Sequence, residues 1–122
     1  MQRDMDLCRE ILLKVEAKHT GSSSVIRIQN SDPKEQERVD YHTQILTDAG
    51  LLTAQRGFSG GWDINGLTWE GHDFIEATRQ SQTWEQTKSA TAKVGGWTFG
   101  LLKDVAVGII KAKLKANGVD IT

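Results

Sequence analysis

The chain has 122 residues, of which 38% are hydrophobic and 25% charged, and its formal net charge is −1 at pH 7. These values exclude a disordered, collagen-like or low-complexity protein and suit one folded domain with a short appendage. The single cysteine, Cys8, excludes an intramolecular disulfide and a cysteine-based zinc site, and it is typical of a cytoplasmic protein. The polar residues 1–6 do not have the pattern of a signal peptide.

The first predicted element is a helix over about residues 4–18, followed by a short β-branched strand over residues 25–29. One face of this helix carries Leu7, Cys8, Ile11, Leu12 and Val15 at helical spacing.

A second helix is predicted from Pro33 to about Ala49. Asp32 is its expected N-cap, Glu35 completes a capping box, and Gly50 provides a left-handed end.

The next predicted elements are a hairpin and three helices. Strands over residues 51–56 and 62–65 flank a glycine-rich tip at residues 57–61. Thr68 is the expected cap of a helix over about residues 69–80 that turns Phe74 and Ile75 inward. Two more helices are predicted over residues 83–94 and 97–116, joined by a Gly95–Gly96 hinge. We expect three of the four tryptophans to pack on the core: Trp62, Trp69 and Trp84.

This order of elements predicts an α+β fold. It resembles a winged helix-turn-helix domain, whose recognition helix ends in an Ala-Gly-Leu turn, here residues 49–51, and leads into a hairpin called the wing. Only about fourteen residues separate the first two predicted helices, so the middle helix of that fold is expected to be reduced. The predicted organisation is a winged-helix-like domain over residues 1–80 and a C-terminal helical extension over residues 81–122.

Two sequence stretches carry a closer resemblance. The opening Arg-Asp-Met-Asp-Leu at residues 3–7 and the run Leu-Thr-Trp-Glu-Gly-His-Asp-Phe at residues 67–74 stand in this order, with Trp84 and Lys88 following. Together they resemble an uncharacterised family of small bacterial and prophage-encoded proteins, a domain of unknown function. The resemblance implies a bacterial or phage lineage and no particular activity.

Nothing in the sequence indicates an enzyme, a cofactor or a metal site. The three histidines, His19, His42 and His72, lack the spacing of a metal motif, and no nucleophile elbow or phosphate loop is present. We expect structural roles for these histidines and for Cys8.

Nucleic-acid binding has candidate residues on the second helix and the wing. Lysine, arginine, tyrosine and glutamine side chains suit phosphates and base edges, and here they are Lys34, Arg38, Tyr41, Gln44 and Arg56. The second helix also carries four acidic residues, and residues 1–80 hold nine basic and thirteen acidic residues, a net of −4. We therefore expect DNA binding to be weak.

The last predicted helix is apolar on two adjacent arcs. The first arc comprises Leu101, Leu102, Val105, Ile109 and Ala112, and the second comprises Phe99, Ala106, Val107, Ile110 and Leu114. One arc could cover the preceding domain, which would leave the other exposed. The candidate oligomer-interface residues are Trp97, Phe99, Leu101, Leu102, Val105, Ile109, Ile110 and Leu114. Lysines at positions 103, 111, 113 and 115 also suit a membrane surface, whereas a transmembrane span is too short here. The sequence thus favours a non-enzymatic interaction or regulatory module acting as a homo-oligomer, with a dimer as the simplest form. A DNA-binding regulator and a membrane-surface protein are the alternatives.

Overall fold

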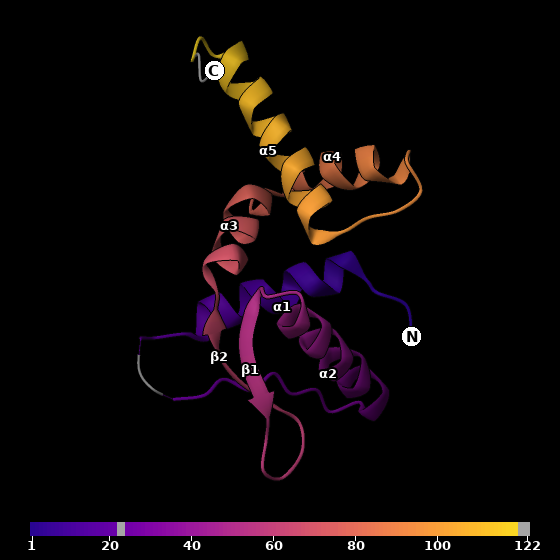
Figure 1. Ribbon diagram of the computed structural model, residues 1–122, viewed down its shortest axis with the longest axis vertical. Coiled ribbons are helices and arrows are strands. Elements are labelled where there is room, and N and C mark those ends of the chain that lie inside the picture. Colours follow the sequence, from indigo (N-terminus) through magenta and orange to yellow (C-terminus); the bar gives the residue numbers. More distant parts are fainter. Residues whose placement is uncertain (22–23, 120–122) are drawn as a thin grey trace. The chain divides into compact units, whose positions relative to one another are not determined.

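The computed structural model describes residues 1–21 and 24–119 and has an α+β fold (Figure 1). This confirms the predicted fold class, and the arrangement is consistent with a winged-helix-like domain followed by C-terminal helices. The chain divides into two compact units, Met1–His72 and Asp73–Thr122, so the division lies inside a helix. The elements are α1 (Met5–Lys18), α2 (Pro33–Asp48), β1 (Leu52–Arg56), β2 (Trp62–Leu67), α3 (Trp69–Thr78), α4 (Ser81–Ala92) and α5 (Phe99–Ala116).

Side-chain caps begin α1 and α2. An Asp4 oxygen accepts hydrogen bonds from the backbone N–H groups of Asp6 and Leu7, and Asp32 accepts one from Lys34. The predicted capping box is wrong, because the Asp32 N–H donates to Asn30 instead and Glu35 is ion-paired elsewhere. The core of the first unit includes these fully buried side chains of α1 and α2: Cys8, Ile11, Leu12, Val15, His42, Thr43 and Leu46.

The hairpin of β1 and β2 is antiparallel, with a bulge between Thr53 and Ala54. The strand predicted over residues 25–29 is reduced to one bridge, in which Ile26 and Ile64 exchange backbone hydrogen bonds of 2.7 and 2.9 Å. The reason is that the Gln36 side chain, rather than a neighbouring strand, binds the next backbone groups of this segment. No helix is present between α1 and α2 in the part of the chain that the structure describes, as the short separation predicted.

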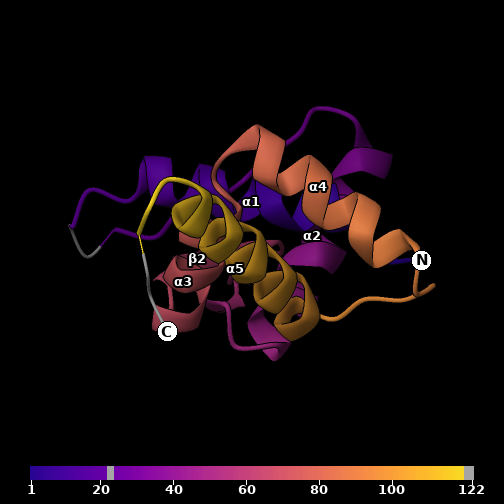
Figure 2. The same ribbon diagram turned by 90° about the horizontal axis from the view of Figure 1, so that it is seen from above.

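The second unit is built on the hairpin of helices α4 and α5, which lie side by side (Figure 2). The Phe74 ring contacts Trp84 and Phe99 edge to face, at centroid distances of 6.3 and 5.7 Å. A buried stripe of threonines on α4 comprises Thr83, Thr87 and Thr91. The last two hydroxyls donate to the carbonyl oxygens four residues earlier, so the stripe keeps its polar groups satisfied.

The tryptophan predictions are confirmed in part. Trp84 is buried and Trp62 half-buried. The prediction for Trp69 is wrong, because its side chain is 78% exposed at the first position of α3, on the outer face of the helix.

The junction between α2 and α3 explains why residue 71, in the Leu-Thr-Trp-Glu-Gly run at residues 67–71, is a glycine. Gly50, at φ +81°, ends α2 in the left-handed conformation. The Thr68 hydroxyl donates to the Gly50 carbonyl oxygen and accepts from the Gly71 N–H at 3.1 Å. A Cβ atom at Gly71 would collide with the backbone carbonyl of Leu51. Residue 71 must therefore be glycine for α3 to begin this close to the end of α2.

We expect Gly71→Ala to lower the free energy of unfolding by about 1–3 kcal/mol, because backbone has to move to admit the methyl group. Gly108→Ala is the matched control, since Gly108 lies in α5 and a methyl group there would have no neighbouring atom within 4 Å. There alanine should raise the stability by about 0.5–1 kcal/mol through helix propensity. Urea denaturation followed by circular dichroism measures both, and a Gly71→Ala protein as stable as the parent would contradict the assigned contact.

Candidate functional site

The predicted nucleic-acid residues on α2 do not form a free basic surface. Lys34 and Gln44 are exposed, but Arg38 is fixed within the protein. One of its terminal nitrogens lies 3.1 Å from both Glu35 carboxylate oxygens, and the other lies 2.9 Å from an Asp4 oxygen. Hydrogen bonding and the charge of Glu35, with a contribution from Asp4, raise the pKa of Arg38. Its hydrogen-bonding groups therefore bind neighbouring carboxylates rather than facing a duplex.

Beside Arg38, the buried His42 connects α2 to the start of α1. Its Nε2 accepts the Asp4 backbone N–H at 2.8 Å, and its Nδ1 lies 2.7 Å from the Arg38 carbonyl oxygen. An N–H donor at one nitrogen and a carbonyl acceptor at the other require a neutral ring with its proton on Nδ1. The Tyr41 ring packs edge to face on this imidazole, at a centroid distance of 5.5 Å. This pair thus has a structural role.

The fifth candidate, Arg56, lies on the wing. Its guanidinium sits over the Trp62 ring, 5.2 Å from the centroid. At the hairpin tip the Phe58 side chain is fully exposed. The five predicted residues therefore include two exposed side chains on α2, one on the wing and two that the fold uses.

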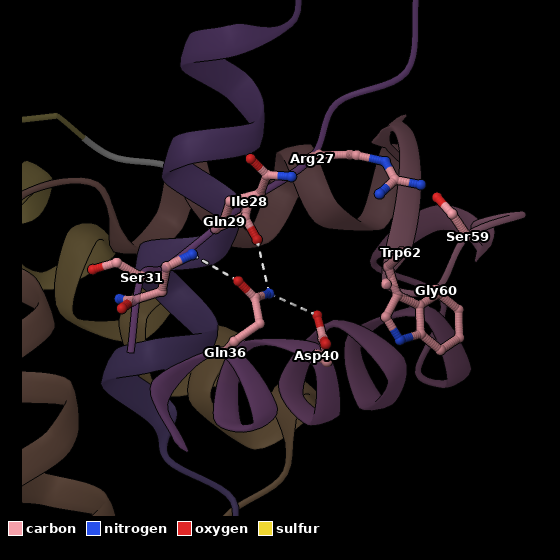
Figure 3. Close-up of a pocket in the computed structure, with 11 residues that line it drawn as sticks. Arg27, Ile28, Gln29, Ser31, Gln36, Asp40, Ser59, Gly60 and Trp62 are labelled. Atoms are coloured by element: carbon pink, nitrogen blue, oxygen red, sulfur yellow. Dashed lines mark hydrogen bonds between the residues drawn. The ribbon is translucent and has the colours of Figure 1, made fainter. Parts of the chain in front are cut away.

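A polar cavity of about 570 Å³ lies between residues 27–31, α2 and the hairpin tip (Figure 3). The Gln36 amide fixes one wall: its nitrogen donates to the Ile28 carbonyl at 3.1 Å and to Asp40 Oδ1 at 2.9 Å. Its oxygen accepts the Asn30 N–H at 2.6 Å. All polar groups of this amide have partners, so the wall is held in one conformation.

Arg27 fixes the opposite wall of this cavity. Its Nε donates to Asp63 Oδ1 at 2.7 Å, and its guanidinium lies against the hairpin tip. A Cβ atom at Gly57 would collide with that guanidinium and would lie 2.6 Å from the Gly60 carbonyl oxygen. Sequence analysis missed this cavity, although the glycine-rich tip was a signal that something approaches the hairpin closely.

A second cleft of about 360 Å³ in the first unit brings His19 and His72 to the same surface as Glu16. Within the described residues, no group of three or more histidine, cysteine or acidic side chains is placed to hold a metal ion. The cleft therefore gives no reason to assign a metal.

The predicted interface residues of α5 differ in exposure. Leu102 is fully buried, so its assignment to an interface is corrected: it belongs to the core of the chain itself. The ring centroids of Trp97 and Phe99 lie 5.3 Å apart, and the Phe99 ring also contacts Phe74 edge to face. Leu101 is 37% exposed. The remaining four are half-buried and are Val105, Ile109, Ile110 and Leu114.

A groove of about 370 Å³ lies between α5 and the second half of α3. Its floor is apolar and includes Ala77, Val107 and Ile110. Asp73 and Glu76 line it from α3, and Lys103 and Lys111 line it from α5. Val107 was absent from the predicted interface, although it lies on the second apolar arc of the helix.

Residues 2–97 match the model of a family described as hypothetical protein DUF2513. The chain belongs to the DUF2513 family. It is also 30% identical over 119 residues to an uncharacterized protein of Haemophilus influenzae (strain ATCC 51907 / DSM 11121 / KW20 / Rd), a match that covers 93% of this chain and 99% of the relative. These matches confirm the predicted membership of an uncharacterised family. No solved structure matches the chain, and none of its described helices is both long and apolar enough to cross a membrane.

Cys8 is buried in the core, and desolvation raises the pKa of its thiol from 9.0 to about 12. Between these pH values the unfolded chain loses this proton while the folded chain keeps it. The contribution of Cys8 to stability should therefore fall as pH rises from about 9 to 12. We expect unfolding free energies measured across this range to decline more steeply for the parent than for Cys8→Ala. Equal slopes would contradict the burial of the thiol.

We expect only weak binding of duplex DNA, with a dissociation constant of about 10 µM or weaker at physiological salt. The reason is the use of Arg38 in ion pairs and the four carboxylates on α2. Fluorescence anisotropy with a labelled random duplex measures this. Nanomolar binding to a defined duplex that is lost in Arg38→Ala would contradict it.

Proposed function

We propose that this protein is a non-enzymatic interaction module that self-associates through α5 and the second half of α3, most simply as a two-fold dimer. The observation that supports the proposal is the apolar groove between these two helices. Its floor consists of aliphatic side chains, and its two sides carry opposite charges.

The apolar surface of α5 exceeds what the chain covers. Along this helix only the side chains of Leu102 and Ala106 are fully buried. Val107 and Ile110 remain partly exposed in the groove, and Leu101 is exposed on another part of the helix. Partly exposed aliphatic side chains gathered in a groove, as Val107 and Ile110 are, are typical of a protein-binding face.

The charges beside the groove favour a second copy as the occupant. A two-fold axis that runs along the groove brings the same surface of two copies face to face. It places the acidic side of one groove, Asp73 and Glu76, opposite the basic side of the other, Lys103 and Lys111. Within one chain the Lys103 Nζ lies 3.7 Å from Asp73, so this pair is already partly neutralised, whereas Lys111 is exposed. Opposite charges across an interface fix its register more than its affinity.

Two details, one on α5 and one on α3, favour self-association over a membrane surface. The Lys113 Nζ donates to the Thr83 hydroxyl at 3.0 Å, so this lysine binds the chain itself rather than a lipid headgroup. Asp73 and Glu76 beside the groove would repel anionic lipids.

We expect light scattering coupled to size-exclusion chromatography to give the mass of a dimer for the full chain. Val107→Asp should shift the protein to a monomer, because a carboxylate in the apolar floor is costly to bury. Val94→Asp is the matched control, since Val94 is 73% exposed outside the groove, and this variant should stay dimeric.

Charge reversal tests the register of the dimer. Lys111→Glu should weaken it, and adding Glu76→Lys should restore it. A full chain that is monomeric at high concentration would contradict the proposal. If that monomer sedimented with anionic liposomes, the membrane-surface alternative would replace it.

A further inference from the structure

We propose that the polar cavity between residues 27–31, α2 and the hairpin tip binds a cationic side chain, an arginine or lysine, of a partner protein segment. This site lies in the first unit and does not depend on self-association through α5. The charges that line the cavity, its aromatic wall and the rigidity of both walls all favour such a ligand (Figure 3).

The uncompensated charge in this cavity is negative. Arg27 lines it, but its Nε lies 2.7 Å from Asp63, so the two charges offset one another. Asp40 is the other charged residue lining it. One Asp40 oxygen accepts a hydrogen bond from Gln36, and within the described residues this carboxylate has neither an ion pair nor a second hydrogen bond. A half-buried carboxylate with an unused oxygen is a strong acceptor for an ammonium or guanidinium group.

Trp62 supplies the aromatic part of the site. Its indole lines the cavity, and the same ring already attracts a cation, the guanidinium of Arg56, which is not among the lining residues. Tryptophan is the most favourable aromatic partner for a cation. A carboxylate and an indole in one cavity therefore suit a charged head on an apolar stem, which is the chemistry of an arginine or lysine side chain.

Both walls are fixed before a ligand arrives. The Gln36 amide orients Asp40, and the ion pair of Arg27 with Asp63 holds the hairpin tip. A site held in one conformation loses less side-chain entropy on binding than a mobile one. A lone carboxylate is too few ligands for a metal ion, and the negative charge disfavours a nucleotide phosphate.

The test is a ¹⁵N-NMR titration of the full chain with the peptide acetyl-Gly-Arg-Gly-amide. The control peptide carries citrulline, the neutral isostere of arginine. We expect the indole N–H resonance of Trp62, assigned as the one missing in Trp62→Phe, to shift with the arginine peptide and not with citrulline. Free arginine is a third ligand: weaker binding than the peptide supports a protein segment as the occupant, and equal or tighter binding would contradict it.

Two variants separate the site from general electrostatics. Asp40→Asn keeps an oxygen that can accept from Gln36 and removes the charge, so we expect affinity to fall at least about tenfold, as for loss of a charge-assisted hydrogen bond. Asp48→Asn removes an equal charge at an exposed position near the end of the same helix and should leave affinity unchanged. Circular dichroism confirms that both variants fold.

Three outcomes would overturn the proposal. They are the absence of a Trp62 shift at millimolar peptide, equal binding of arginine and citrulline peptides, and equal loss of affinity in Asp40→Asn and Asp48→Asn. Asp40-dependent binding of guanosine without peptide binding would also overturn it and assign the cavity to a nucleobase.

Discussion

Asp4 joins the two helices of the first unit, and the positions of Arg38 and the buried His42 relative to α1 depend on it. One carboxylate oxygen caps α1, the other binds Arg38, and the backbone N–H donates to the buried His42. No helix lies between α1 and α2 in the described part of the chain. The hydrogen bonds at Asp4 therefore join the start of α1 directly to α2. They also occupy Arg38, which is the residue best suited to read a base edge.

The two stretches that carry the family resemblance have structural explanations. Asp4 belongs to the first stretch, and Thr68 and Gly71 belong to the second. The second pair fixes the junction after α2, through the hydrogen bonds of Thr68 and the close approach of Gly71 to Leu51. These residues set the positions of helices. The cavity beside α2 and the groove beside α5 are lined by other residues.

Much of the fold could be predicted from local sequence, because caps, helical spacing and turn glycines act over a few residues. The helix α1 and the hairpin follow from such signals, as does the left-handed Gly50. The strand at residues 25–29 is reduced to one bridge, and the Gln36 side chain of the following helix binds the Ile28 carbonyl and the Asn30 N–H instead. The cavity could not be predicted either. Asp40 and Trp62 line the same cavity only because the tertiary fold brings α2 and the hairpin together, and no sequence spacing predicts this.

In α5 the helical spacing of apolar residues predicts the helix, but it does not predict which face of the helix is buried. Helical spacing separates its apolar residues into two arcs and predicts that one arc packs while the other stays free. In the structure the fully buried residues are Leu102 from one arc and Ala106 from the other, so the covered stripe runs along the line where the arcs meet. Lys113 lies on the same stripe, and its ammonium group donates a hydrogen bond to the Thr83 hydroxyl of α4. A threonine-lined partner helix thus decides which face of α5 is covered, and it leaves apolar surface on both sides. The apolar surface beside α3 forms the groove. Its acidic and basic sides can each pair with the opposite charges of a second copy of the chain.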